Sequence, residues 1–286
     1  MKVLLATDGE APSEEATAFL ARLVDPARVQ VEVLSVNGFE LTFRESMSLG
    51  HYSPGAGQEQ AERATREAAA ALAEAGIQAS QTVVEGDEAS EILRVAGQGG
   101  HGLVVLGTGK ERWLDTVTLG SVSTSVLHAA PCPVLVVHTA PDHDGPVRVL
   151  VGTDGSEGAE RALATFTGVA DPARCTVEVL SAVKPTALPR GGPAGAAADD
   201  EVTDDATAAA MGHAEAGAAV LRDAGFQVTT EVVAGSPASV LLERAGEAGH
   251  DLVVVGARGL GRFKAKVLGS VSDRVVRRAP ASLIGH

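Results

Sequence analysis

Residues 252–278, LVVVGARGLGRFKAKVLGSVSDRVVRR, contain the most informative pattern of this chain. Leu252 to Val255 is a short apolar run rich in β-branched residues, which predicts a buried strand. After Gly269 the apolar residues recur at helical spacing, which predicts a helix. The loop between strand and helix carries four basic residues and no acidic residue: Arg258, Arg262, Lys264 and Lys266. Because a helix N-terminus has free N–H groups and favours negative charge, and glycine allows close approach, this stretch predicts a phosphate site.

The same pattern occurs twice along the chain. TDGE at residues 7–10 returns as TDGS at 153–156, DPAR at 25–28 returns at 171–174, and LGSVS at 119–123 returns at 268–272. The repeat distance is 146 residues near the start of each copy and 149 near its end. Such a period is far longer than that of solenoid repeats. The chain is therefore a tandem duplication, and we expect domains at residues 1–139 and 147–286 joined by a short linker.

Within each copy, strand and helix patterns alternate. In the first copy the apolar pattern predicts strands at residues 2–6, 30–36, 79–84, 103–106 and 134–137, and helices at 13–24, 59–75, 87–98 and 121–130. Strands joined by helical crossovers form a parallel sheet. The predicted fold class is α/β, with tandem doubly wound (Rossmann-like) domains, each a five-stranded parallel sheet with helices on both faces. Residues 39–60 and 185–205 are rich in Gly, Pro and acidic residues, which predicts loops.

The composition points to a water-soluble protein and away from nucleic acid. The chain is 45% hydrophobic and 21% charged, and its formal net charge is −14. An acidic surface cannot displace counterions from nucleic acid. No apolar run reaches the length of a membrane helix, so we expect no membrane partner. Two cysteines imply no disulfide framework, so the expected location is the cytoplasm.

The second copy resembles a known nucleotide-binding signature. Its spacing G-x2-G-x9-G-S, running from Gly256 through Gly259 to Gly269 and Ser270, is similar to the ATP-binding motif of the universal stress protein family in its tandem two-domain form. TDGS after the first strand and VEVLS in the second strand add to the resemblance, which covers essentially the whole chain. The resemblance implies ATP, or AMP or ADP, at the carboxyl ends of the strands, with Mg²⁺ as a companion of the phosphates.

The resemblance also implies residue roles in the second copy. Asp154 meets the adenosine end and Ala182 lines the base pocket. The ribose and phosphates pass the glycine loop and are held by the following helix start: Gly256, Arg258, Gly259, Gly269, Ser270, Val271 and Ser272. Two ordinary explanations stay open: Asp154 as a turn residue and Ser270 as a helix N-cap. The matching positions of the first copy are weaker candidates: Asp8, Val36, Gly107, Gly120 and Ser121.

The two glycine loops differ in charge. Lys110 stands where the second copy has Gly259, and the basic residues of the first loop, Lys110 and Arg112, are balanced by Glu111 and Asp115. We therefore predict that the second copy binds nucleotide more tightly and that the first copy is weak or empty.

The sequence shows no positioned general base, so no catalytic residue is assigned; whether the chain is an enzyme stays open, with slow ATP hydrolysis as the upper bound. The sequence contains no Cys/His cluster, so we expect no structural metal site. His101 and His250 recur at matched positions and are expected to be turn or packing residues. The function expected is a stress-response or signalling protein whose nucleotide occupancy changes its conformation or an unknown protein partner. The alternative is an interaction or scaffold module of the same fold that binds no nucleotide.

The apolar run Val134–Val137 favours edge pairing between strands. We therefore expect the two copies to form a dimer-like unit within the chain. Homodimerisation of the whole chain stays open.

Overall fold

The computed structural model describes residues 1–38, 56–109, 119–184, 186–187, 200–201, 203–259 and 268–286. The first copy contains, in order, β1 (Lys2–Ala6), α1 (Ala11–Leu23), β2 (Gln30–Asn37), α3 (Ala56–Glu74), β3 (Ala79–Glu85), α4 (Glu88–Gly99), β4 (Leu103–Gly107), α5 (Ser121–Ala129) and β5 (Val134–Val137). The second copy contains β6 (Val147–Gly152), α6 (Glu157–Val169), β7 (Cys175–Val183), β8 (Thr186–Ala187), β9 (Asp200–Glu201), α7 (Asp204–Asp223), β10 (Gln227–Ala234), α8 (Pro237–Glu247), β11 (Leu252–Gly256), α9 (Ser270–Val276) and β12 (Ala281–Gly285).

Local sequence explains where several helices begin and end. Asp87 accepts a hydrogen bond from the backbone N–H of Ser90, at 2.9 Å, and so caps α4 as its sequence predicts. Ser156 caps α6 in the same way through the N–H of Ala159. Gly76 follows α3 with φ of +79°, a left-handed conformation that favours glycine.

Two segments predicted as loops contain regular structure. Helix α3 begins at Ala56, so residues 56–58 are helical rather than loop, and the helix formers Gln58, Glu59 and Gln60 continue into the helix predicted from residue 59. Thr186–Ala187 and Asp200–Glu201 form a two-stranded antiparallel pair within residues 185–205. Residues 39–55 and 188–199 lie outside the described part of the chain.

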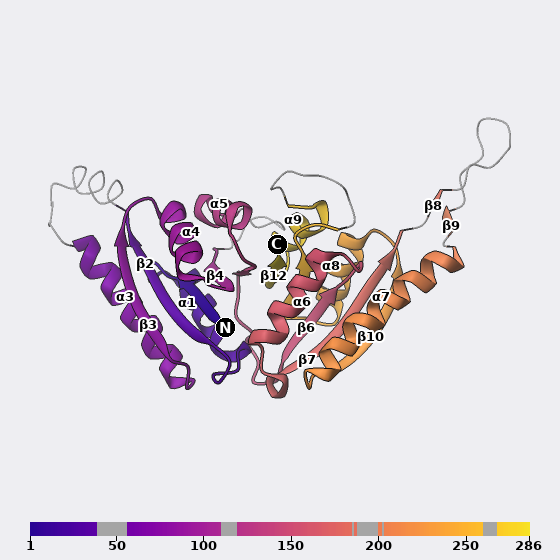
Figure 1. Ribbon diagram of the computed structural model, residues 1–286, viewed down its shortest axis with the longest axis horizontal. Helices are drawn as coiled ribbons and strands as arrows, with labels where there is room; N and C mark the ends of the chain where they lie inside the picture. Colours follow the sequence, from indigo (N-terminus) through magenta and orange to yellow (C-terminus); the bar gives the residue numbers. More distant parts are fainter. Residues whose placement is uncertain (39–55, 110–118, 185, 188–199, 202, 260–267) are drawn as a thin grey trace.

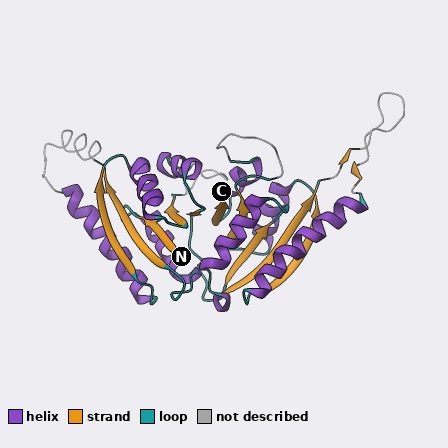
Figure 2. Ribbon diagram, in the orientation of Figure 1, coloured by secondary structure: helices purple, strands orange, loops and turns teal. Residues whose placement is uncertain are grey.

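The predicted fold class is confirmed, and the two sheets join into one. Each copy has a parallel five-stranded sheet, in the order β3-β2-β1-β4-β5 and β10-β7-β6-β11-β12. Strands β5 and β12 pair antiparallel, from Val134 opposite Ile284 to Val137 opposite Ala281. The edge pairing expected for residues 134–137 is therefore present within the chain, as part of a ten-stranded sheet. Figure 1 shows β3 and β10 toward the two outer ends of the molecule, and Figure 2 shows helices packed along the sheets of both copies.

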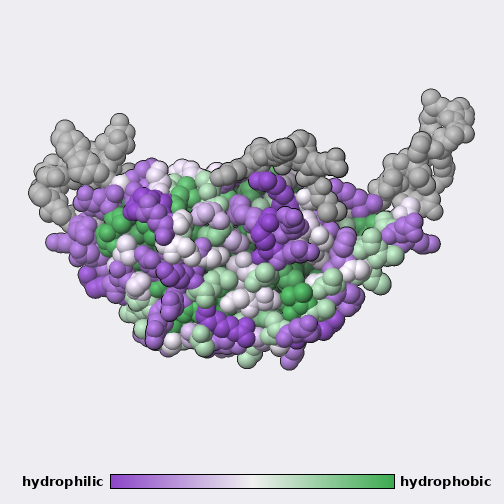
Figure 3. All heavy atoms as spheres, in the orientation of Figure 1, coloured by the Kyte–Doolittle hydropathy of each residue, from purple (hydrophilic) through white to green (hydrophobic). Residues whose placement is uncertain are grey.

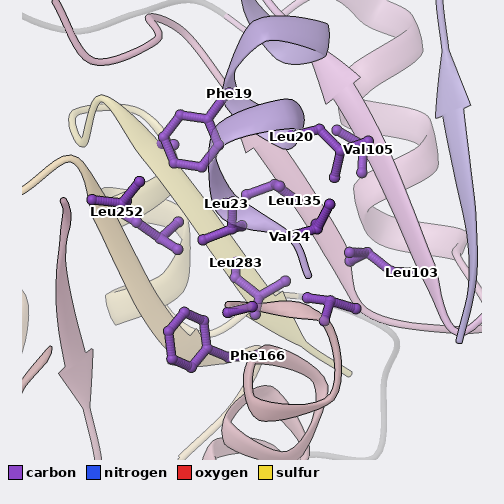
Figure 4. Close-up of a cluster of buried hydrophobic side chains, with 14 of the residues drawn as sticks. Phe19, Leu20, Leu23, Val24, Leu103, Val105, Leu135, Phe166, Leu252 and Leu283 are labelled. Carbon is purple, nitrogen blue, oxygen red and sulfur yellow. The ribbon is translucent and has the colours of Figure 1, made fainter. Parts of the chain in front are cut away.

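The hydrophobic core also runs through both copies. Phe19 on α1 and Phe166 on α6 are fully buried in one cluster that includes Leu135 and Leu283 of the seam strands. Figure 4 shows these side chains gathered where the two copies meet. A second cluster lies on the other face of the sheet, beneath α4, α5, α8 and α9. The halves therefore share their apolar interior.

The repeated DPAR segments form matched contacts between the copies. The backbone N–H of Asp25 donates to the carbonyl of Val169 at 2.8 Å, and that of Asp171 donates to the carbonyl of Leu23 at 2.9 Å. The guanidinium of Arg28 reaches the carbonyl of Thr167, as that of Arg174 reaches the carbonyl of Ala21. Each DPAR segment therefore satisfies the C-terminal carbonyls of the helix in the other copy, which are left without partners inside that helix.

Candidate functional site

The carboxyl ends of the strands bring the predicted site residues of each copy together. Asp8 follows β1 and Asp154 follows β6, while the glycine loops leave β4 and β11, the neighbouring strands of the sheet. In an open parallel sheet this is where the strand order reverses and where ligands bind. Most of the charged residues that distinguish the two glycine loops lie at 110–118 and 260–267, outside the described residues.

The first glycine of each loop is required by the packing of the strand end against a helix. A Cβ on Gly256 would lie 2.6 Å from the backbone nitrogen of Ala159 on α6. A Cβ on Gly107 would overlap the backbone of Pro12 on α1. Since backbone cannot rotate away, both positions need glycine for the strand to approach the helix.

In the second copy, Asp154 lies directly against the glycine loop. Its Oδ1 accepts a hydrogen bond from the N–H of Ser156 at 3.1 Å, as an ordinary turn residue does. Its Oδ2 occupies the space that a Cβ on Gly259 would need. The hydroxyl of Ser156 donates to the carbonyl of Arg258 at 3.2 Å and so fixes the loop to the start of α6. Asp154 thus acts as a turn residue with one oxygen and faces the loop with the other.

The start of α9 combines internal hydrogen bonds with free N–H groups. The N–H of Gly269 donates to the carbonyl of Ala257 at 2.7 Å, and the buried hydroxyl of Ser272 donates to the same carbonyl at 2.8 Å. The first bond of the helix runs from the N–H of Asp273 to the carbonyl of Gly269. The N–H groups of Ser270, Val271 and Ser272 therefore have no acceptor within α9. Ser270 is exposed and Val271 half-buried.

Ala182 is half-buried near the end of β7, opposite Val233 of β10 in the sheet register. Its counterpart Val36 is half-buried near the end of β2, opposite Val84. Both residues therefore lie at the same edge of the sheet as the aspartates.

The first copy holds a cavity at this edge. It has a volume of about 440 Å³, and all five residues predicted as weaker candidates line it: Asp8, Val36, Gly107, Gly120 and Ser121. Within the part of the chain that the structure describes, a Cβ on Gly120 would meet no atom within 4 Å. The sequence did not predict a cavity of this size, and the ligand role of these five residues stays a prediction.

Several residues of this cavity were missed by sequence reasoning. They come from the start of α1, from α4 and from the loop after β4: Ser13, Glu88, Ile92 and Thr108. Burial raises the pKa of Glu88, and the nearby carboxylates of Asp8 and Asp87 raise it further. Alignment of VVEGDEAS with VVAGSPAS places Pro237 opposite Glu88, and this difference is the signal that could have drawn attention to it.

Two other cavities lie outside the first-copy site. One of about 820 Å³ lies beside the linker and is lined by residues that include Asp142, Glu243, Arg274 and Arg278. A smaller one of about 130 Å³ lies between α5 and the second glycine loop. Among the described residues, no group of three or more His, Cys, Asp or Glu side chains could hold a metal ion.

The paired histidines each contact a glutamate of a sheet strand, Glu32 on β2 and Glu178 on β7. His101 Nε2 lies 3.1 Å from Glu32 Oε2, and His250 Nε2 lies 3.4 Å from Glu178 Oε2. Burial lowers the pKa of His250 even though Glu178 favours the protonated ring. The imidazole of His250 is therefore neutral near pH 7, and its contact with Glu178 is a polar packing contact rather than a full ion pair.

The surface is mainly hydrophilic on the face drawn in Figure 3. No helix within the described ranges combines the length and apolar character needed to cross a membrane.

A family model and the related sequences point to the same protein family. The sequence model described as the universal stress protein family matches residues 1–138 and again 147–284. A universal stress protein of Mycolicibacterium smegmatis is 36% identical over 182 residues, which are 62% of this chain and 58% of the relative. A universal stress protein of Mycobacterium tuberculosis H37Rv is 33% identical over 192 residues, which are 64% of this chain and 60% of the relative. The matched regions thus span about three fifths of these relatives.

Solved structures show the same fold over nearly the whole chain. The crystal structure of a universal stress protein from Archaeoglobus fulgidus has a TM-score of 0.70 at 23% identity and covers 99% of this chain and 97% of that one. A putative universal stress protein from Pseudomonas aeruginosa has a TM-score of 0.61 at 15% identity, covering 99% and 92% of the two chains. At these identities the likeness concerns the fold.

Proposed function

The chain belongs to the universal stress protein family, and from this premise we propose that its second copy binds an adenine nucleotide, ATP or its products AMP and ADP, with Mg²⁺ bound to the phosphates. In this proposal, nucleotide occupancy changes the conformation of a cytoplasmic stress-response protein or its choice of protein partner. The shared core and the β5–β12 seam would carry such a change from one copy to the other.

One observation supports this proposal most: Asp154 faces the glycine loop at Gly259, next to a helix start with free N–H groups. A carboxylate is an acceptor for ribose or base N–H and O–H groups, and a helix N-terminus is a donor for phosphate oxygens. The hydroxyl of Ser272 donates a hydrogen bond to the carbonyl of Ala257. The phosphate contacts proposed here are therefore the backbone N–H groups of Ser270 and Val271 and the hydroxyl of Ser270. Arg258 adds positive charge at the same loop.

The test uses the full chain, because the seam joins both halves. Calorimetric titration with ATP·Mg is carried out on wild type, Asp154→Asn and the matched control Asp8→Asn. Asparagine keeps the Oδ1 acceptor that serves Ser156 or Glu10, so the turns are preserved. We expect Asp154→Asn to weaken ATP binding by about tenfold, the loss of one hydrogen bond to a charged group, and Asp8→Asn to leave it unchanged.

Binding should also raise the melting temperature, since the ligand stabilises only the folded state. Absence of both heat and thermal shift at millimolar ATP would refute the proposal and leave the interaction module as the function.

A further inference from the structure

The cavity of the first copy differs from the second site in its charge. Asp8 and Glu88 both line it, and no Lys, Arg or His is found among the described residues of its lining. In the second copy, the position of Glu88 holds Pro237 and the position of Gly109 holds Arg258. Among the described residues, the first copy therefore places two carboxylates at its cavity, whereas the matching positions of the second copy hold one.

The carboxylates of the cavity have unused acceptor atoms. Asp8 Oδ1 accepts from the N–H of Glu10 at 2.9 Å and from the hydroxyl of Ser13 at 2.8 Å, whereas its Oδ2 makes no hydrogen bond within the described protein. Glu88 is half-buried, and its side chain forms no hydrogen bond or ion pair with the rest of the described chain. A partly buried carboxylate without a donor is costly, so a ligand that donates hydrogen bonds would be favoured here.

The apolar part of the cavity lining suits the flat ring of a nucleobase. The walls are apolar and come from the sheet, from α4 and from α5: Leu34, Val36, Ile92, Leu106 and Val122. Such a combination of an apolar body and a few convergent polar groups is typical of small-molecule sites. A phosphate group in the same space would face Asp8 and Glu88 with like charge, which disfavours it.

We propose that the first copy binds a nucleoside without phosphates, through its apolar walls and the free carboxylate oxygens of Asp8 and Glu88. This inference rests on the proposed function for the adenine class of ligand and goes further, because it gives the two copies different ligands. One chain would then respond separately to a phosphorylated and an unphosphorylated form of the same compound.

Ile92 allows the first copy to be observed by itself. The chain contains three isoleucines, Ile77, Ile92 and Ile284, and only Ile92 lines this cavity. The full chain labelled with ¹³C in the isoleucine δ1-methyl groups is titrated with adenosine and, separately, with AMP, and the Ile92 signal is assigned with Ile92→Val. We expect adenosine to shift the Ile92 methyl signal, and AMP to bind about tenfold more weakly than adenosine at this site.

Glu88→Gln is the decisive variant, because it removes the charge and keeps the size of the side chain. We expect AMP binding at Ile92 to strengthen to within about threefold of adenosine, while adenosine binding changes little. An Ile92 signal that does not respond to millimolar adenosine, or wild-type affinities that are equal for AMP and adenosine, would overturn the proposal.

The outcome is separable from that of the proposed function. ATP·Mg binding that depends on Asp154 tests the second copy, whereas the Ile92 signal tests the first. Failure of ATP to bind, together with a response of Ile92 to adenosine, would refute the nucleotide proposal alone. The reverse pattern would refute the nucleoside proposal alone.

Discussion

Leu283→Ala should destabilise both copies together, although the side chain belongs to the second. Leu283 is 2% exposed on β12 and stands opposite Leu135 of β5 in the antiparallel seam. Removing a buried leucine side chain costs about 2–5 kcal/mol, from lost burial and from the cavity that remains. Because the surrounding cluster includes Phe19 of the first copy and Phe166 of the second, the loss is expected to spread to both.

The assay combines urea unfolding with hydrogen exchange resolved by peptide. The expected result is one unfolding transition with its midpoint at a lower urea concentration. The shift of the midpoint equals the loss in the free energy of unfolding divided by the m-value. Exchange should rise in β1 and β4 as well as in β6 and β11, since cooperative units open together. The control is Val220→Ala on α7, where 47% exposure predicts a change within about 0.5 kcal/mol.

Two separated transitions in the Leu283→Ala protein, with exchange in the first copy unchanged, would refute the reasoning. In that case the copies would be independent domains that only touch, and the seam could not carry a signal between their sites.

Two further predictions concern titratable groups. Burial raises the pKa of Cys132 to about 11 and that of Cys175 to about 12, so neither thiol should react with a disulfide reagent at pH 8 until the chain is unfolded; rapid reaction of the native protein would contradict this. Burial lowers the pKa of His250 from 6.5, so the unfolded chain binds more protons there below that pH, and stability should fall as the pH decreases from 7 to 5.5. His250→Gln should reduce this pH dependence in urea titrations, and an unchanged slope would show that other groups cause it.

Much of the architecture could be predicted because it depends on local pattern. The apolar runs of β4 and β11 gave the buried strands, and Asp87 gave the start of α4 through its own capping bond. The duplication was visible in repeated segments such as DPAR. Since parallel strands with helical crossovers place their carboxyl ends at one edge, Asp8 and Asp154 could also be assigned to the site edge from sequence.

Which atoms remain available to a ligand depends on contacts that the folded chain alone contains. The sequence predicts Ser272 as a phosphate ligand, but folding brings the carbonyl of Ala257 to its hydroxyl. The fold also brings α6 against Gly256, so this position needs glycine for packing, and the ligand contact predicted for it stays a prediction. Glu88 lies far from Asp8 along the chain, and the fold places both at one cavity. Local pattern specifies elements, because the contacts that form them are near in sequence; the identity of free donors and acceptors depends on contacts between distant residues, which exist only after the chain has folded.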